Sequence, residues 1–323
     1  MRYLVSRTAG FQDRDRWGPN VDSEDEVQRV HARGRSLPAW IKPVATRWFQ
    51  LVFGLRLLSL SRQYDAMAVG RHGVWLPILL RILGIRKRVI MMDTEWPGSG
   101  SGLMNHLAAT SSTLVVCNTK AEIERYSREF RIPTEKFSLV PMAFQSSDQR
   151  AAWDGGYVFA GGVQSRDWDT FTRAVDGLPY PVKVLADRKL PYLPANTTMG
   201  FASRKEFYGQ VAGASCVVVP IIPERLRVTG ITTWTNAMAM GKVVIVTDPE
   251  GASDYMEHGV SGFYVNYGDV EGLRRCIDLV MRDPLLRKRV GQAAQERAWK
   301  EFSPEAFRRR VLRLMGCKDP HTA

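Results

Sequence analysis

Cysteine is scarce in this sequence, and its four cysteines form no C-x-x-C pair, which argues against disulfide bridges and zinc ligation. Cys117 and Cys216 lie inside apolar, strand-like runs, so we expect buried thiols in a reducing compartment. Long apolar runs are also missing. The longest, 74–85, is interrupted by Arg81, so we expect no transmembrane helix. Residues 1–6 lead directly into a strand and contain no apolar core of a signal peptide.

The common glycine pattern of dinucleotide sites is absent as well. The glycine-rich run 97–102 fails the G-x-G-x-x-G pattern because Leu103 occupies the last glycine position, so we interpret it as a flexible loop. D-x-D sequences occur at 13–15 and 167–169. The first lies in a charged loop. The second lies in the first turn of a predicted helix, where the helix dipole favours aspartate. Neither is interpreted as a metal site.

The chain is long enough for two domains of about 150 residues each, and its net charge of +12 is unevenly spread. Residues 1–145 hold 21 Lys and Arg against 13 Asp and Glu. Within 36–92, basic residues alternate with Leu and with Trp40, Trp48 and Trp75. That pattern suits an anionic membrane surface. It equally suits a core with solvated arginines, whereas nucleic acid is less favoured.

Short β-branched runs alternate with helical patterns along the whole chain, which predicts an α/β fold with two doubly wound parallel sheets. Predicted strands are 2–6, 64–69, 88–92, 113–117, 137–141, 156–162, 182–186, 198–201 (an edge strand), 215–220, 243–248 and 262–265. Predicted helices are 37–60, 75–83, 118–130, one from Arg166, and 203–212, 230–241, 269–281, 284–299 and 302–315. Residues 11–26 are expected to form a polar loop and 143–156 a linker.

The most informative stretch is 215–248, which reads as strand, turn, helix and strand. Its helix opens at Gly230, with Thr229, Thr232 and Thr233 around the first turn. Free backbone N–H groups, the positive end of the helix dipole and small hydroxyl groups therefore meet at one place. Such a helix start is suited to binding a phosphate or diphosphate.

The run Thr-Thr-x-x-Asn-Ala-Met-Ala-Met-Gly-Lys within this stretch resembles the donor-site signature of GT-B glycosyltransferases of the family-4-like group. Residues 113–141, with Asn-Thr, Ile-Pro-x-x-Lys and Val-Pro, resemble the end of that family's first domain. Asn236 stands where the family usually has a ribose-binding Glu, and Val228 replaces the first Glu of its E-x7-E motif. The site has therefore either changed its sugar contacts or become degenerate.

The resemblance implies a GT-B fold, two Rossmann-like domains facing a central cleft. The acceptor domain would be 1–145, the nucleotide-sugar domain 146–302, and 303–323 a helix crossing back to the first domain. It also implies a diphosphate pocket with cations at strand ends. The residues expected to hold the donor are Arg166, Arg188, Lys189, Gly200, Phe201, Thr229, Gly230, Thr232, Thr233 and Asn236. Glu224 could replace one sugar contact.

Catalytic candidates are the polar residues that follow strands of the first domain. Asp93 and Glu95 come after the strand 88–92, and His72 after 64–69. A carboxylate or His there could take a proton from the acceptor. Each is also explained as a helix cap or a turn residue. The family-4-like group is mostly retaining, which is the expectation here.

The sequence thus predicts a cytoplasmic glycosyltransferase, with a peripheral position at the inner face of the membrane as one expectation. It would use a UDP- or GDP-sugar, a lipid-linked or small-molecule hydroxyl acceptor, and neither a metal nor another cofactor. A GT-B scaffold protein with an inactive donor site and a nucleotide-sugar epimerase are the alternatives.

Overall fold

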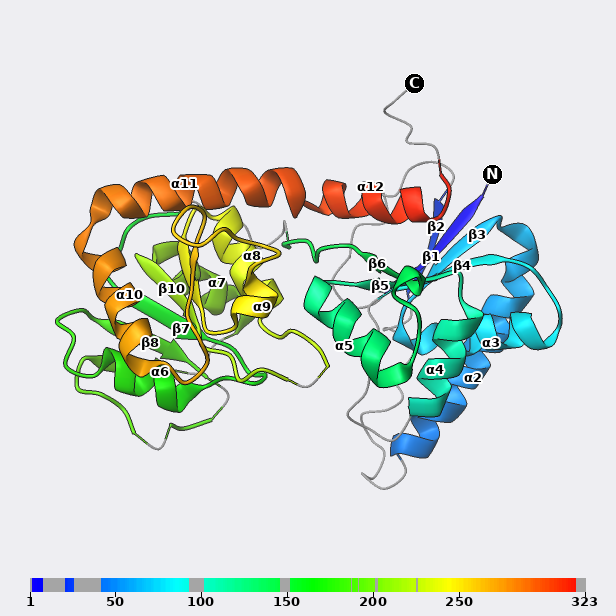
Figure 1. Cartoon of the computed structure of the whole chain (residues 1–323), viewed down its shortest axis with the longest axis horizontal. Coiled ribbons are helices and arrows are strands. Elements are labelled where there is room, and N and C mark those ends of the chain that lie inside the picture. The colour runs from blue at the N-terminus through cyan, green and yellow to red at the C-terminus, as the bar shows by residue number, and fades with distance from the viewer. Residues whose placement is uncertain are drawn as a thin grey trace. The chain divides into compact units, whose positions relative to one another are not determined.

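The computed structural model describes residues 2–7, 21–25, 42–92, 102–145, 152–186, 188–190, 192–200, 203–224 and 226–317. The chain forms two compact units, each a sheet covered by helices (Figure 1). Unit 1 contains 1–140 and 308–323, and unit 2 contains 141–307. The α/β prediction is therefore confirmed.

Unit 1 is built on a parallel sheet with the order β2-β1-β3-β4-β5-β6. Its strands are β1 (Tyr3–Arg7), β2 (Val21–Asp25), β3 (Ala66–Val69), β4 (Arg88–Met91), β5 (Leu114–Cys117) and β6 (Phe137–Leu139). Its helices are α2 (Lys42–Leu60), α3 (Trp75–Ile82), α4 (Gly102–Ser111) and α5 (Lys120–Phe130). Short 3₁₀ turns are η2 (Ser61–Gln63), η3 (Arg71–Gly73) and η4 (Thr134–Lys136).

Two parts of unit 1 differ from the sequence prediction. The loop expected over 11–26 contains β2, which pairs in parallel with β1. Its sequence, Val-Asp-Ser-Glu-Asp, is too polar to be recognised as a strand, because backbone pairing at a sheet edge does not require apolar side chains. The helix α4 was not predicted. Its first residue, Gly102, is also the last residue of the glycine-rich run 97–102, which reads as a loop.

Unit 2 is built on a second parallel sheet with the order β12-β11-β10-β7-β8-β9. Its strands are β7 (Val158–Gly161), β8 (Val182–Leu185), β9 (Thr197–Gly200), β10 (Cys216–Val219), β11 (Val243–Val246) and β12 (Phe263–Tyr264). Its helices are α6 (Trp168–Val175), α7 (Arg204–Gly213), α8 (Ile231–Ala239), α9 (Pro249–Ala252), α10 (Val270–Arg282) and α11 (Pro284–Glu301). Helix α12 (Pro304–Leu314) begins in unit 2 and ends in unit 1. The strand order reverses between β7 and β10, which is where ligands bind in open α/β sheets.

The core of unit 2 lies on both faces of β10 and β11. Both strands are buried at every position, as expected for β-branched runs in a parallel sheet. Val217 and Val219 pack on one face with Trp234 of α8. Cys216 and Val218 pack on the other face with Phe171 of α6. Each such buried side chain contributes roughly 1.5–3 kcal/mol, so this core fixes the start of α8 firmly.

The predicted linker is anchored to unit 2 at both ends. At its beginning, the N–H of Phe144 donates to the carbonyl of Phe302 at 3.0 Å. At its end, the N–H of Trp153 donates to the carbonyl of Ala212 at 3.0 Å. The segment 143–156 has no periodic pattern in its sequence, yet its Phe144 is fully buried in unit 2. These described parts therefore belong to the folded unit and are not a free connection.

The chain returns to unit 1 within α12, where the Nε of Arg88 donates to the carbonyl of Leu314 at 2.7 Å. All four cysteines are free thiols, and Cys117 and Cys216 are buried as predicted. None of the helices in the described ranges is both long and apolar enough to cross a membrane.

Candidate functional site

The loops that follow β7 and β10 are joined at the point where the strand order reverses. The N–H of Asp167 donates to the carbonyl of Pro220 at 3.1 Å, and that of Ile222 donates to the carbonyl of Ser165 at 2.9 Å. The hydroxyl of Thr247, at the end of β11, accepts from the N–H of Ile221 at 2.6 Å. Three adjacent strand ends thus hold one rigid platform.

Arg166 lies in this platform with its side chain buried. Its guanidinium donates to the carbonyls of Gly161 at 3.2 Å and Gln164 at 2.6 Å. It lies so close to Gly162 that a Cβ at that position would collide with it, and Gly162 has a φ of +132°. Burial lowers the pKa of Arg166 to about 10, so the side chain stays cationic at neutral pH. A pre-positioned, poorly hydrated cation is a strong attractor for an anion.

Helix α8 begins beside this cation. Gly230 is its N-cap, with a φ of +86° that favours glycine. A Cβ at Gly230 would lie 2.7 Å from Ile221 and 2.9 Å from Val219, and 3.6 Å from an Arg166 guanidinium nitrogen. The N–H groups of Ile231 and Thr232, the first two residues of α8, have no preceding turn of helix to donate to. The buried guanidinium and the positive helix end therefore act on the same volume.

The threonines at the helix start are more buried than a solvent-exposed polar face would be. Thr229 and Thr233 are buried and Thr232 is half-buried. The hydroxyl of Thr229 has no hydrogen-bond partner among the described residues. An unsatisfied buried hydroxyl carries a free-energy cost of about 1–3 kcal/mol, which a ligand oxygen would relieve.

Asn236 has an internal role in this structure. It is fully buried, its Nδ2 donates to the carbonyl of Thr232 at 2.7 Å, and its Oδ1 accepts from the N–H of Gln145 at 3.1 Å. A ribose contact would have to displace at least one of these bonds. The expected ribose role of Asn236 stays a prediction.

The other motif position, Val228, is buried against Gly251. Glu224 forms an ion pair with Arg227 at 2.7 Å and accepts a hydrogen bond from the hydroxyl of Ser165. Burial acts to raise the pKa of Glu224, but these two hydrogen bonds outweigh it and leave the pKa below its ordinary value. The carboxylate is therefore ionised and is attached to the Arg166 loop.

Three of the remaining donor-site candidates lie in the described residues, at the same sheet edge. Arg188 and Lys189 follow β8 and are exposed, and Gly200 is the last residue of β9. That strand is the sheet edge, as predicted. Phe201 lies outside the described residues.

The acid and base candidates belong to unit 1. His72 lies in η3 directly after β3 and is buried. Strands β3 and β4 are parallel neighbours, so His72 and Met92, which follow them, lie at the same sheet edge. Asp93 and Glu95 themselves lie outside the described residues. Their catalytic roles stay predictions.

The D-x-D sequence at 167–169 is a helix cap, as expected. A side-chain oxygen of Asp167 accepts from the N–H of Thr170 at 3.1 Å, and Asp169 pairs with Arg173 on the exposed side of α6. Within the described ranges no group of three His, Cys, Asp or Glu side chains is placed to hold a metal ion. The other D-x-D, at 13–15, lies outside those ranges.

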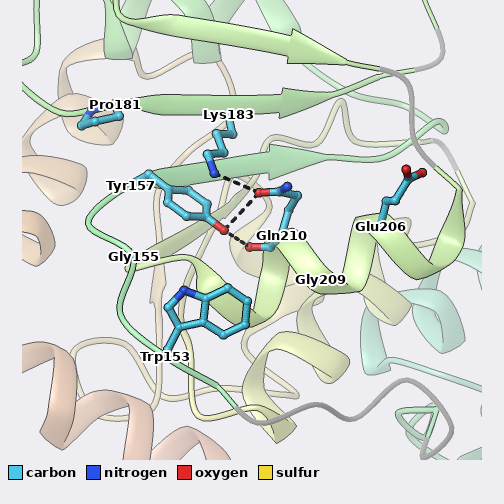
Figure 2. Close-up of a pocket in the computed structure, with 8 residues that line it drawn as sticks. All are labelled: Trp153, Gly155, Tyr157, Pro181, Lys183, Glu206, Gly209 and Gln210. Atoms are coloured by element: carbon cyan, nitrogen blue, oxygen red, sulfur yellow. Dashed lines mark hydrogen bonds between the residues drawn. The ribbon is translucent and has the colours of Figure 1, made fainter.

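A cavity of about 540 Å³ occurs elsewhere in unit 2 (Figure 2). It is lined by Trp153, Gly155, Tyr157, Pro181, Lys183, Glu206, Gly209 and Gln210. Tyr157 and Pro181 directly precede β7 and β8, so the cavity opens at the amino ends of these strands, the edge opposite Arg166.

Figure 2 shows the side chains of Tyr157, Lys183 and Gln210 directed at one another. The Tyr157 hydroxyl donates to the carbonyl of Gln210 at 2.7 Å, and the Lys183 amine donates to its Oε1 at 3.2 Å. The same amine lies 3.9 Å from the centre of the Tyr157 ring. Burial raises the pKa of Tyr157 to about 12. This arrangement ties α7 to the sheet and is separate from the diphosphate candidate.

Sequence reasoning missed three residues that build the platform. Ser165 has a φ of +50°, unusual for a residue other than glycine, and such strain is typical of functional sites. Thr247 accepts a hydrogen bond from the N–H of Ile221, which is distant in the sequence. Arg227 donates to Glu224 within one loop. Only the alternation of strands and helices, which places strand ends together, could have indicated Thr247.

The chain is similar to a protein family, to a curated relative and to solved structures. Residues 196–297 match the family model Glycosyl transferases group 1. The chain is 28% identical over 224 residues to the lipopolysaccharide core biosynthesis glycosyltransferase LpsE of Rhizobium meliloti. That alignment covers 63% of this chain and 64% of LpsE, which is less than two thirds of the relative's length.

Solved structures show the same fold over nearly the whole chain. Sucrose-phosphate synthase from Thermosynechococcus elongatus has a TM-score of 0.69 at 14% identity, covering 97% of this chain and 87% of its own. Anabaena HepE in complex with UDP has a TM-score of 0.67 at 14% identity, covering 98% of this chain and 100% of its own. At such identities the likeness establishes the fold, an α/β fold of the GT-B type.

Proposed function

We propose that the chain, whose residues 196–297 match the Glycosyl transferases group 1 model, is a glycosyltransferase that transfers a sugar from a nucleotide-diphosphate sugar to a hydroxyl acceptor. The donor is a UDP- or GDP-sugar. UDP is the first choice, because HepE, a protein of the same fold, binds UDP.

The observation that carries this proposal is the position of Arg166 at the start of α8. A nucleoside diphosphate gains negative charge as its bond to the sugar breaks, so the transition state is stabilised by fixed positive potential at the phosphates. The buried guanidinium and the helix end supply that potential from rigid elements. The unpartnered hydroxyl of Thr229 and the exposed cations Arg188 and Lys189 add donors around the same sheet edge.

The transfer is proposed to be retaining and independent of metal. Arg166 and the helix terminus neutralise the leaving diphosphate, the task that a divalent ion performs in metal-dependent transferases. His72, with Asp93 and Glu95, is proposed to orient the acceptor hydroxyl and accept its proton.

A second candidate is a GT-B protein whose donor site no longer supports transfer. The observation that favours it is the state of the two motif positions: Val228 is apolar and buried, and the amide of Asn236 is engaged within the fold. Neither offers the carboxylate that the resemblance would require. A nucleotide-sugar epimerase is distinguished by its products, since it converts the donor without an acceptor.

Calorimetric titration tests the proposal. UDP and GDP are added separately, with and without Mg²⁺, to the wild type and to Arg166→Ala. We expect one nucleotide to bind with the same affinity in either condition, and the variant to bind far more weakly. Absence of binding by both nucleotides contradicts the proposal. Binding without turnover of any nucleotide sugar in a donor panel supports the inactive alternative.

The location is also part of the proposal. We propose a cytoplasmic protein held at the inner face of a membrane, where a lipid-linked acceptor would be presented. The net positive charge of residues 1–145 supports this, because the inner leaflet is anionic.

A further inference from the structure

Helix α2 is apolar on two opposite sides. Phe53 and Leu57, one turn apart, are buried against unit 1. Trp48, Val52 and Leu55 follow the i, i+4, i+7 spacing of a second stripe and are 67%, 47% and 49% exposed. A helix covered on one side only normally has a polar outer side. The outer stripe therefore indicates a surface that is covered by something else in use.

The neighbouring helices extend this surface. Strands β3, β4 and β5 are consecutive in the sheet, so right-handed crossovers place α3 and α4 on the same face. Helix α3 packs against both α2 and α4 (Figure 1). The end of α3 exposes Ile82 and Leu83 at 72% and 56%, and α4 exposes Leu103 at 73%. We name these six side chains, Trp48, Val52, Leu55, Ile82, Leu83 and Leu103, the α2–α4 face.

The charges around the α2–α4 face have one sign. Arg47 and Arg56 lie on either side of the α2 stripe, and Arg81 and Arg86 flank Ile82 and Leu83; all four are exposed. Residues 42–92 contain a single acid, Asp65, whose carboxylate accepts from the N–H of Arg2 at 2.8 Å. An exposed Trp with aliphatic side chains and a rim of arginine is the composition of an interfacial membrane-binding surface.

From this arrangement we infer that the α2–α4 face docks on an anionic lipid bilayer, with Trp48 and Leu103 inserted among the headgroups and the arginines on lipid phosphates. Charge complementarity selects lipid over nucleic acid, which would contact the arginines and leave six apolar side chains in water. The inference rests on the proposed function in one respect: docking would give the enzyme access to a lipid-linked acceptor.

Co-sedimentation of the full chain with vesicles tests the inference. Two vesicle types are used, pure phosphatidylcholine and phosphatidylcholine with roughly one third phosphatidylglycerol. The wild type is expected to bind only the anionic vesicles, and binding should fall at least tenfold between about 50 and about 500 mM salt. Trp48→Ser with Leu55→Ser, and separately Arg47→Glu with Arg86→Glu, should each weaken binding at least tenfold.

Matched controls come from unit 2. Leu285 and Arg173 are exposed there. Leu285→Ser therefore controls for the loss of an apolar side chain, and Arg173→Glu controls for the reversal of a basic charge. Both should bind vesicles like the wild type. Absence of binding to anionic vesicles at low salt overturns the inference, as do equal losses in the controls.

Sedimentation velocity tests whether a second copy of the chain, instead of a membrane, binds the α2–α4 face. A dimer that the Trp48→Ser and Leu55→Ser changes dissociate, without vesicle binding, would assign the face to a second copy of the chain and overturn the inference. UDP titration of the same variants should match the wild type, because all four substitutions are in unit 1. Loss of vesicle binding with intact UDP binding therefore separates docking from the donor function.

Discussion

Asn236 accepts a hydrogen bond from the backbone N–H of Gln145 at 3.1 Å, across 91 positions of sequence. Its Nδ2 donates to the carbonyl of Thr232 one turn earlier in α8. One buried amide therefore fastens the segment that enters unit 2 to the helix whose start is the diphosphate candidate. A carboxylate at this position could accept from Gln145 but could not donate to Thr232.

Asn236→Asp is accordingly expected to destabilise the protein by about 1–3 kcal/mol, because it removes the donor and places a charge beside a carbonyl. Urea unfolding followed by circular dichroism measures this. Gln292→Ala, on the exposed side of α11, should change the stability by less than about 0.5 kcal/mol. Unchanged stability of Asn236→Asp together with weakened UDP binding would instead assign Asn236 to the ribose.

Arg166 is expected to govern nucleotide affinity. Replacing a buried cation that hydrogen-bonds a charged ligand costs about 1.5–3 kcal/mol, so Arg166→Ala should raise the Kd of UDP roughly ten- to a hundredfold. Arg173→Ala removes an exposed cation paired with Asp169 and should leave the Kd unchanged. Equal Kd values for wild type and Arg166→Ala, with both variants folded, would remove Arg166 from the donor site.

The sequence predicted those features that follow from local chemistry. The β-branched runs at β10 and β11 and the cap at Asp167 were found because each is determined by a few adjacent residues. Strand β2 was missed because its side chains are polar and show no apolar strand pattern, whereas the strand forms through backbone pairing with β1. The role of Asn236 was missed for a similar reason, since its partner Gln145 lies in a stretch without periodicity.

The candidate site shows the same division. The Gly230 helix start could be read locally because glycine, threonine and the following apolar helix are contiguous. The proximity of Arg166 to that start depends on two strands separated by about 60 residues being neighbours. The strained Ser165 has no sequence signal, because a positive φ at serine is imposed by the surrounding fold.

Lys242 should make stability depend on pH. Burial lowers its pKa to about 8, although Asp154 acts in the opposite direction. Between about pH 8 and the ordinary lysine pKa near 10.4, the unfolded chain binds more protons at this site than the folded chain. The contribution of Lys242 to stability therefore rises with pH across that window.

Comparing wild type with Lys242→Met isolates this contribution, since other titrating groups are common to both. Urea unfolding at about pH 7.5 and pH 10 should show the wild type gaining stability relative to the variant as pH rises. The variant also loses the hydrogen bond from the amine to the carbonyl of Trp153 at 2.6 Å, so the test rests on the change of the stability difference between the two pH values and not on its absolute size. A constant difference between the two proteins at both pH values would contradict the lowered pKa.

Gly209 offers a stabilising substitution. It lies in the interior of α7 at the cavity of Figure 2, and an added Cβ would have no neighbour within 4 Å. Glycine in a helix interior costs about 1 kcal/mol relative to alanine, so Gly209→Ala should raise the free energy of unfolding by about 0.5–1 kcal/mol. Gly213, at the end of the same helix, is the matched control, because a Cβ there would lie 2.6 Å from both the Trp153 ring and the Tyr157 hydroxyl. Gly213→Ala should therefore destabilise the protein in the same urea measurement. Equal stabilisation of both variants would contradict this prediction. It would mean that helix propensity alone determines the change in stability and that the packing at Gly213 is looser than the structure shows.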